Sequence, residues 1–223
     1  MTNAEWAACP DLAPMLGFLR QSGKLSRRKW RLFGAACCHR IRHLLADERS
    51  RRAVGVAERY ADGDATADEL DAAFEAAFDV GAELAEEMGR DPTAFVAAGR
   101  DPLRAAAWAA SSVAHPDESA DGVAFEAAEA SGSPGEQEAQ CELLRCLFGG
   151  SLHSPPIEPP WRTPTVKGLA EGIYKDGAFD RLPLLADALQ AAGCDDPAIL
   201  GHCRLVRTHA KGCWVVDLVL EME

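Results

Sequence analysis

The sequence lacks the features that mark exported, membrane-spanning and sheet-rich proteins. Its N-terminus has no basic segment followed by an unbroken apolar run, so we expect no secretory signal. No stretch approaches the roughly 18 consecutive apolar residues of a membrane-spanning helix. Tyrosine occurs only twice, and β-branched residues are scarce. We therefore expect a soluble, cytoplasmic protein with no membrane partner.

Recognised catalytic signatures are missing as well. The chain has no glycine-rich phosphate loop with its lysine, and no GxSxG nucleophile turn. It also lacks the CxxC spacing that makes many zinc sites easy to recognise. These absences favour a non-catalytic role over an enzymatic one, without excluding enzymes of another kind.

What the sequence does contain favours helices. Apolar residues make up 48% and charged residues 26% of the chain, and alanine, which loses no side-chain entropy in a helix, is heavily used. Helix start signals recur: Asp47, the capping-box pair Thr66 and Glu69, and Asp101 followed by Pro102. Apolar residues spaced three or four apart, at Trp30, Phe33, Cys37, Ile41 and Leu44, predict a helix over residues 26–45. We expect an all-α protein, a multi-helix bundle of eight to ten helices.

A proline-rich stretch divides the chain. The segment "GGSLHSPPIEPPWRTPT" at residues 149–165 holds five prolines, which prevent a helix. We therefore predict an N-terminal helical bundle over residues 1–150, a connector over 151–165 pinned by Trp161, and a smaller C-terminal helical unit over 166–223. We expect that unit to pack on the bundle.

The eight cysteines predict reduced thiols or a metal site in place of a disulfide framework. Cys37 and Cys38 are adjacent within a predicted helix, where they point in different directions. Without an export signal, the compartment is expected to be reducing.

The C-terminal tail offers the strongest metal pattern. Its ligands would be Cys194, Cys203, His209 and Cys213, spaced C-x8-C-x5-H-x3-C, with His202 as a spare. Zinc prefers this mixture of thiolate and imidazole. The competing interpretation is core packing, because a buried cysteine behaves as a small hydrophobe.

Two other arrangements of histidine and cysteine remain open. Cys213 could act as a nucleophile with His209 as its base and Asp217 orienting the imidazole, in an enzyme whose substrate site is a cleft between the two predicted units. A metal-dependent enzyme acting in the same cleft is the related alternative. His39 and His43, four residues apart, could chelate a metal from one helix face, although the neighbouring Arg40 would repel a dication.

Charge is unevenly distributed along the chain, whose net charge is −12. Residues 20–52 carry eleven Lys or Arg against two acidic residues, whereas residues 53–146 carry twenty-one acidic and five basic residues. A footprint for phosphate or another anionic partner would use Arg27, Arg28, Arg31 and Arg42. Because the whole chain is acidic and holds no recognised reading motif, internal pairing with the middle region is the favoured interpretation, and nucleic acid is not the expected partner.

Several stretches together resemble an uncharacterised protein family found in multiple copies in planctomycete-type bacteria. The resemblance covers about two-thirds of the chain and rests on the Cys37–Cys38 pair, on His202–Cys203–Arg204, and on "GCWVVD" at residues 212–217. It implies no reaction. The sequence departs from the family pattern around Cys146, which is therefore left out of any predicted site. The leading prediction is a cytoplasmic interaction or regulatory module with a protein partner and a structural zinc in its tail.

Overall fold

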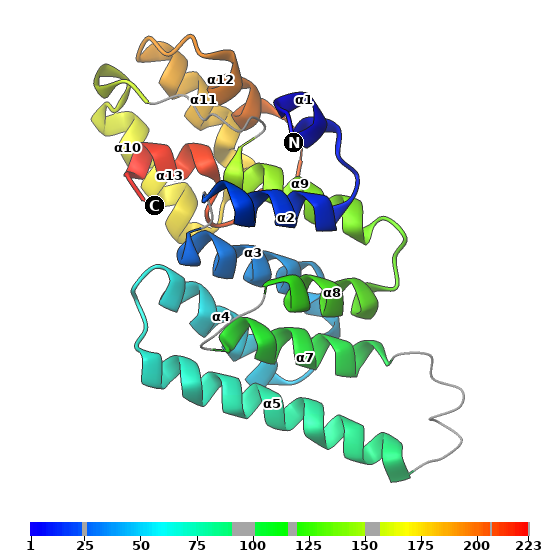
Figure 1. Ribbon diagram of the computed structural model, residues 1–223. Coiled ribbons are helices and arrows are strands. Elements are labelled where there is room, and N and C mark those ends of the chain that lie inside the picture. The colour runs from blue at the N-terminus through cyan, green and yellow to red at the C-terminus, as the bar shows by residue number, and fades with distance from the viewer. Residues whose placement is uncertain (24–25, 91–100, 116–119, 150–156, 206, 223) are drawn as a thin grey trace. The chain divides into compact units, whose positions relative to one another are not determined.

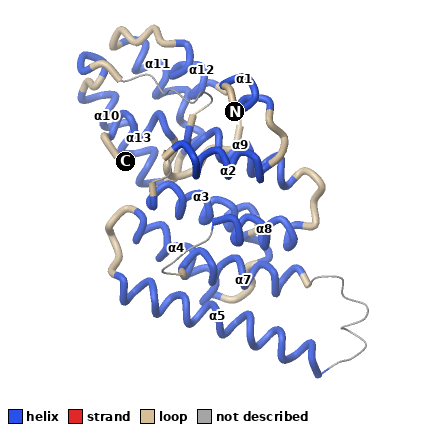
Figure 2. Tube along the Cα trace, in the orientation of Figure 1, coloured by secondary structure: helices blue, strands red, loops and turns tan. Residues whose placement is uncertain are grey.

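The computed structural model describes residues 1–23, 26–90, 101–115, 120–149, 157–205 and 207–222. Every regular element within these ranges is a helix, and none is a strand (Figures 1 and 2). The predicted all-α fold class is confirmed. Twelve α-helices and three 3₁₀ turns are formed in the described residues, more than the eight to ten helices expected. Among these helices, none has the length and apolar character to cross a membrane.

The predicted start signals are confirmed. The Thr66 hydroxyl accepts from the Glu69 backbone N–H at 3.2 Å, and the Glu69 carboxylate accepts from the Thr66 N–H at 2.8 Å, a closed capping box. It begins α5 (Ala67–Arg90). Asp47 caps α4 (Glu48–Ala61), and Asp101 caps α7 (Pro102–Ala114).

The helix predicted over residues 26–45 is shorter in the structure. Helix α3 (Arg27–Arg40) is followed by its cap residue Ile41, whose φ of −102° and ψ of 18° leave the helical region. A 3₁₀ turn, η1 (Arg42–Leu44), comes next. The guanidinium of Arg51 donates to the backbone carbonyls of Leu45 and Ala46. These bonds hold the chain in the bend before α4, a device that apolar periodicity does not reveal.

The chain forms two compact units, and the division differs from the predicted one. The middle unit comprises residues 25–140, and the terminal unit combines residues 1–24 with residues 141–223. Of the predicted connector, residues 151–156 lie outside the described part of the chain. Trp161 lies in η2 (Pro159–Trp161) and is buried, as expected of an anchor.

The middle unit is built from long, alanine-rich helices. Helix α5 packs on α4 and α7, α7 packs on α8 (Ala120–Ser131), and α3 packs on α4 and α8 (Figure 1). Two helical glycines allow close approach. A Cβ at Gly34 would lie 3.1 Å from Val113 Cγ2, and a Cβ at Gly81 would lie 3.1 Å from the Trp108 ring. Tight helix contacts of this kind explain why the core is made so largely of small residues.

The terminal unit combines the two ends of the sequence, and its helices are mostly shorter. They are α1 (Asn3–Ala8), α2 (Leu12–Ser22), the C-terminal part of α9 (Glu136–Phe148), η2, α10 (Pro164–Asp176), η3 (Phe179–Arg181), α11 (Leu182–Ala191), α12 (Pro197–Arg204) and α13 (Trp214–Leu220). The indole N–H of Trp6 donates to the Gly149 carbonyl at 2.8 Å. Arg145 donates to the carbonyls of Trp6 and Cys9. These long-range bonds place the first helices in this unit and not in a bundle of residues 1–150.

Candidate metal centre

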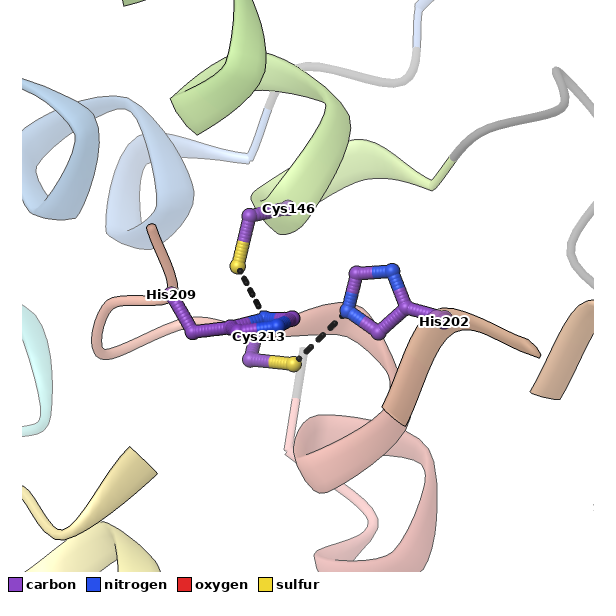
Figure 3. Close-up of side chains that lie close together, drawn as sticks. All are labelled: Cys146, His202, His209 and Cys213. Atoms are coloured by element: carbon purple, nitrogen blue, oxygen red, sulfur yellow. Dashed lines mark hydrogen bonds between the residues drawn. The ribbon is translucent and has the colours of Figure 1, made fainter. Parts of the chain in front are cut away.

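Four side chains of the terminal unit converge on one point (Figure 3). Cys146 comes from the last turn of α9, His202 from the last turn of α12, and His209 and Cys213 from the segment that joins α12 to α13. One ligand atom from each residue lies within 4.8 Å of all the others. All but the half-buried His209 are buried. This group could hold a metal ion.

A tight turn brings two of these ligands together. The Cys213 N–H donates to the Ala210 carbonyl at 3.0 Å, and Gly212 has a φ of 82°. Gly212 is the third residue of this turn, and glycine adopts positive φ there at no steric cost. The spacing His-Ala-Lys-Gly-Cys therefore has a local structural reason. It positions His209 and Cys213 for the same site.

The other two ligands are fixed by helix ends. Asp196 caps α12, because its carboxylate accepts from the N–H groups of Ala198 and Ile199 at 2.8 and 3.1 Å. Pro197 occupies the first helical position, where it suits the helix. His202 then falls in the last turn of this short helix. Cys146 lies next to Arg145, whose bonds to the N-terminal segment fix that end of α9.

Two of the ligand–ligand distances approach those of a tetrahedral ion, within a group whose atoms all lie within 4.8 Å of one another. His202 Nε2 lies 3.2 Å from Cys213 Sγ, and Cys146 Sγ lies 3.4 Å from His209 Nδ1. With bonds of about 2.3 Å to sulfur and about 2.0–2.1 Å to nitrogen, a tetrahedral zinc site has ligand–ligand edges of about 3.3–3.8 Å. The two observed distances are close to those edge lengths.

Surrounding groups orient the two imidazoles. His209 Nε2 lies 3.4 Å from the Leu205 carbonyl, which leaves Nδ1 pointing at Cys146. Metal-binding histidines commonly use one ring nitrogen for the ion and donate the other to a carbonyl or carboxylate. The His202 ring meets the rings of His209 and Trp214 edge-on, at centroid distances of 4.9 and 5.3 Å.

The two thiols are electrostatically unequal. Burial raises the pKa of Cys146 well above its ordinary value, and its hydrogen bond to Cys213 raises it further. The Ala210 N–H and the positive charge of Arg207 lower the same pKa by less. Burial also acts to raise the pKa of Cys213. Hydrogen bonds from Cys146, His202 and His209 outweigh it and hold that pKa well below its ordinary value. Of the two thiols, Cys213 is the one whose surroundings favour loss of the proton, and metal binding would displace the protons that the ligands retain.

The structure brings together only two of the four ligands predicted from the tail. His209 and Cys213 belong to the group, whereas Cys194 and Cys203 contribute no ligand atom to it. Cys203 is buried on α12 beside Ile199, and burial raises its pKa. Cys194 follows the C-terminus of α11, and its pKa is also raised by burial. Both fit the core-packing interpretation.

Cys146 and His202 complete the set in their place. His202 was predicted only as a spare ligand, and Cys146 was excluded because it departs from a family pattern. Cys146 lies 56 residues before His202 in the sequence, and only the folded chain shows that they are neighbours.

The alternative histidine pair does not share a helix face. Helix α3 ends at Arg40, so His43 lies in the 3₁₀ turn and not one helical turn beyond His39. His39 Nε2 instead lies 2.9 Å from a Glu58 carboxylate oxygen. In the alternative thiol mechanism, Cys213 would be the nucleophile, but its side chain is fully buried.

The four arginines predicted to bind an anionic partner are not displayed together. Arg31 is 6% exposed and donates to the carbonyls of Val113 and His115 at 2.7 and 3.1 Å. Arg28 pairs with Asp62 at 2.9 Å, and both side chains are largely covered. Arg27 and Arg42 are exposed. Half of the predicted footprint is therefore committed to contacts within the middle unit.

Comparison with models of protein families, with curated proteins and with solved structures finds no match for this chain. The resemblance to a planctomycete-type family consequently stays a prediction. The chemistry of the site is the remaining guide to function.

Proposed function

We propose that this chain is a helical interaction module whose terminal unit is held together by a structural zinc ion. The ion would bind Cys146, His202, His209 and Cys213. The observation that carries the proposal is the convergence of four ligand atoms, all within 4.8 Å of one another, from three separate segments of the chain. Four ligands in this arrangement are what a tetrahedral structural site requires.

The donor set favours zinc over other ions. Two sulfurs and two imidazole nitrogens are soft to borderline ligands, whereas magnesium and calcium prefer oxygen. Two thiolates also balance the charge of a dication, so the loaded site would be neutral overall. Neutrality matters here because three of the four ligands are buried, and an uncompensated buried charge is costly.

The same geometry favours a structural over a catalytic ion. Catalytic zinc keeps one coordination position for water or substrate, usually beside three protein ligands. Here the chain itself offers four, and Cys213 and His202 are 0% and 5% exposed. An ion so enclosed would join α9 to the segment between α12 and α13.

The interaction role is supported by exposed aromatic side chains in the middle unit. Phe78 is 44% exposed and meets the Trp108 ring edge-on at a centroid distance of 5.0 Å. Phe125 is 54% exposed. Aromatic residues are enriched at protein interfaces relative to the rest of the surface.

The experiment that tests the zinc site is metal analysis of the full chain purified without a metal-affinity tag. We expect one zinc per chain, and loss of it in Cys146→Ala and Cys213→Ala. The matched controls Cys203→Ala and Cys194→Ala remove equally buried thiols that are outside the group. They should keep the metal.

Cobalt substitution and thiol reactivity distinguish the other outcomes. Cobalt should give the visible spectrum of a tetrahedral ion with two thiolates. A metal-free protein whose Cys213 alone reacts rapidly with iodoacetamide at neutral pH would instead favour a thiol enzyme. Zinc retained in Cys146→Ala would contradict the proposed ligand set.

A further inference from the structure

A second candidate site lies in the middle unit, independent of the metal centre. A half-open cavity of about 310 Å³ is lined by residues of η1, α4, α5 and α7 and by the bend before α4. Its apolar walls are Leu44, Leu45, Val80, Leu84, Leu103 and Ala107. Small-molecule sites in proteins begin at about this size, and a dry apolar cavity of about half the volume holds benzene.

One polar group in the wall has no partner. Ser50 is 1% exposed, and its hydroxyl makes no hydrogen bond although its oxygen is fully covered. A buried hydroxyl without a hydrogen bond is destabilising relative to a bonded one. Ser50 lines the cavity, so a ligand that displaces the atoms covering its hydroxyl and offers it a hydrogen bond would relieve this cost.

Acidic groups set the charge of the site. Asp47, Glu83 and Glu87 line the cavity, and among its described lining residues none is a lysine or arginine. Arg49 pairs with Asp47 at 3.0 Å and with Glu83 at 2.6 Å, which neutralises part of this charge. Arg51 also donates to the carbonyls of Leu45 and Ala46 in the wall, so the three described carboxylates exceed the two guanidinium groups by one negative charge. An anionic head group would be repelled, whereas a neutral or cationic one would not.

We propose that this cavity binds a small amphiphile with an apolar body and a hydrogen-bond-donating head, an alcohol or amine, and discriminates against carboxylates. The apolar body would lie against the leucines of α5 and η1, and the head would meet Ser50 at the start of α4. This inference does not depend on the zinc site, because its residues all belong to the middle unit.

The test is calorimetric titration of the full chain, as purified, with 1-octanol, 1-octylamine and octanoate, which share one chain length. We expect saturable binding of the first two and at least tenfold weaker binding of octanoate. Leu103→Trp should block the mouth and reduce octanol affinity at least tenfold. Because Leu103 is 43% exposed, this variant is expected to fold.

Two further variants test the polar contacts. Ser50→Ala should weaken octanol about fivefold, whereas the control Ser111→Ala, which removes a buried hydroxyl bonded to the Trp108 carbonyl, should not. Glu87→Lys should strengthen octanoate several-fold. Its control, Glu75→Lys, places the same change at an exposed position of α5 that does not line the cavity.

Each opposite result would overturn the proposal. Absence of saturable octanol and octylamine binding would mean that the Ser50 hydroxyl is satisfied only by water. Binding unchanged in Leu103→Trp would place the ligand elsewhere. Equal affinity for octanol and octanoate would remove the assigned head-group selectivity.

Discussion

The two units achieve stability by different means. In the middle unit, helices of up to 24 residues pack along their lengths through alanine and glycine. In the terminal unit, α12 and α13 have eight and seven residues, and loops carry two of the four candidate metal ligands. Isolated helices this short are marginal in water, so their order depends on tertiary contacts.

This difference explains where the cysteines and histidines gather. A unit of short helices gains from a cross-link that fixes several loops at once, as small domains do with disulfides or metals. The long helices of the middle unit have less need of one. The comparison predicts that removal of metal affects one unit and that disruption of packing affects the other.

The largest effect is expected on removal of zinc. Structural zinc sites in small peptides contribute about 10 kcal/mol or more of folding free energy. Chelation should therefore lower the hydrogen-exchange protection of amides in α12 and α13 by at least 100-fold. The protection of amides in α4 and α5 should change little. Hydrogen exchange read out by mass spectrometry measures both units in one sample. Equal loss of protection in α5 would contradict the expectation that the metal stabilises the terminal unit alone.

The next effect belongs to the middle unit. Glu136 is 3% exposed and receives two hydrogen bonds from Arg40, at 2.7 and 2.9 Å. Arg40→Ala leaves this carboxylate buried without its cation, which should cost about 3 kcal/mol of unfolding free energy. Urea unfolding measures the loss. The double variant with Glu136→Ala should recover part of it, and the zinc content should stay unchanged.

A loss below about 1 kcal/mol in Arg40→Ala would mean that the pair behaves like an exposed salt bridge. The stability of the middle unit would then come mainly from the packing of its long helices, with little contribution from this ion pair.

A smaller effect separates two glycines of the middle unit. Gly55 has open space around its Cβ position, whereas a Cβ at Gly81 would lie 3.1 Å from the Trp108 ring. Alanine is favoured over glycine in helices by about 1 kcal/mol, so Gly55→Ala should stabilise by up to that amount. Gly81→Ala should destabilise by about 1 kcal/mol, because the ring must shift. Thermal unfolding of both variants gives the sign directly.

Stabilisation in Gly81→Ala would show that the Trp108 ring moves freely. The middle unit would then be less tightly packed at α5 and α7 than the distances indicate.

The sequence indicated local structure well and long-range pairing poorly. Thr66 with Glu69 and Asp101 with Pro102 are start signals that act within a few residues, so the pattern alone identifies them. The contact of Trp6 with Gly149 joins residues 143 apart, and no periodicity reports it. The predicted boundary at residue 150 failed to anticipate this return of the chain.

The candidate metal site shows the same limit. The turn at Gly212 explains the spacing of His209 and Cys213, which made both visible in the sequence. Cys203 and Cys146 are alike as buried helical cysteines, and only the fold distinguishes the one outside the group from the one inside it. The spacing along the sequence favoured Cys203, because this cysteine is closer in the chain to His209 and Cys213 than Cys146 is.

The smallest expected effect joins the two sides of the comparison. Thr66→Ala and Asp196→Ala each remove the cap of one helix, α5 and α12, at a typical cost of about 1 kcal/mol. In the middle unit the loss should appear as lower stability alone. In the terminal unit the helix carries His202, so the same loss must also appear in metal binding.

If α12 frays in the metal-free protein and is ordered by the ion, about 1 kcal/mol corresponds to an approximately fivefold lower metal affinity. Competition with a chromogenic chelator measures that ratio for both variants. Thr66→Ala should leave the affinity unchanged, and Asp196→Ala should lower it. An unchanged affinity in Asp196→Ala would mean that the site is fully formed before the ion binds, because only an ion that orders α12 can be affected by the loss of its cap.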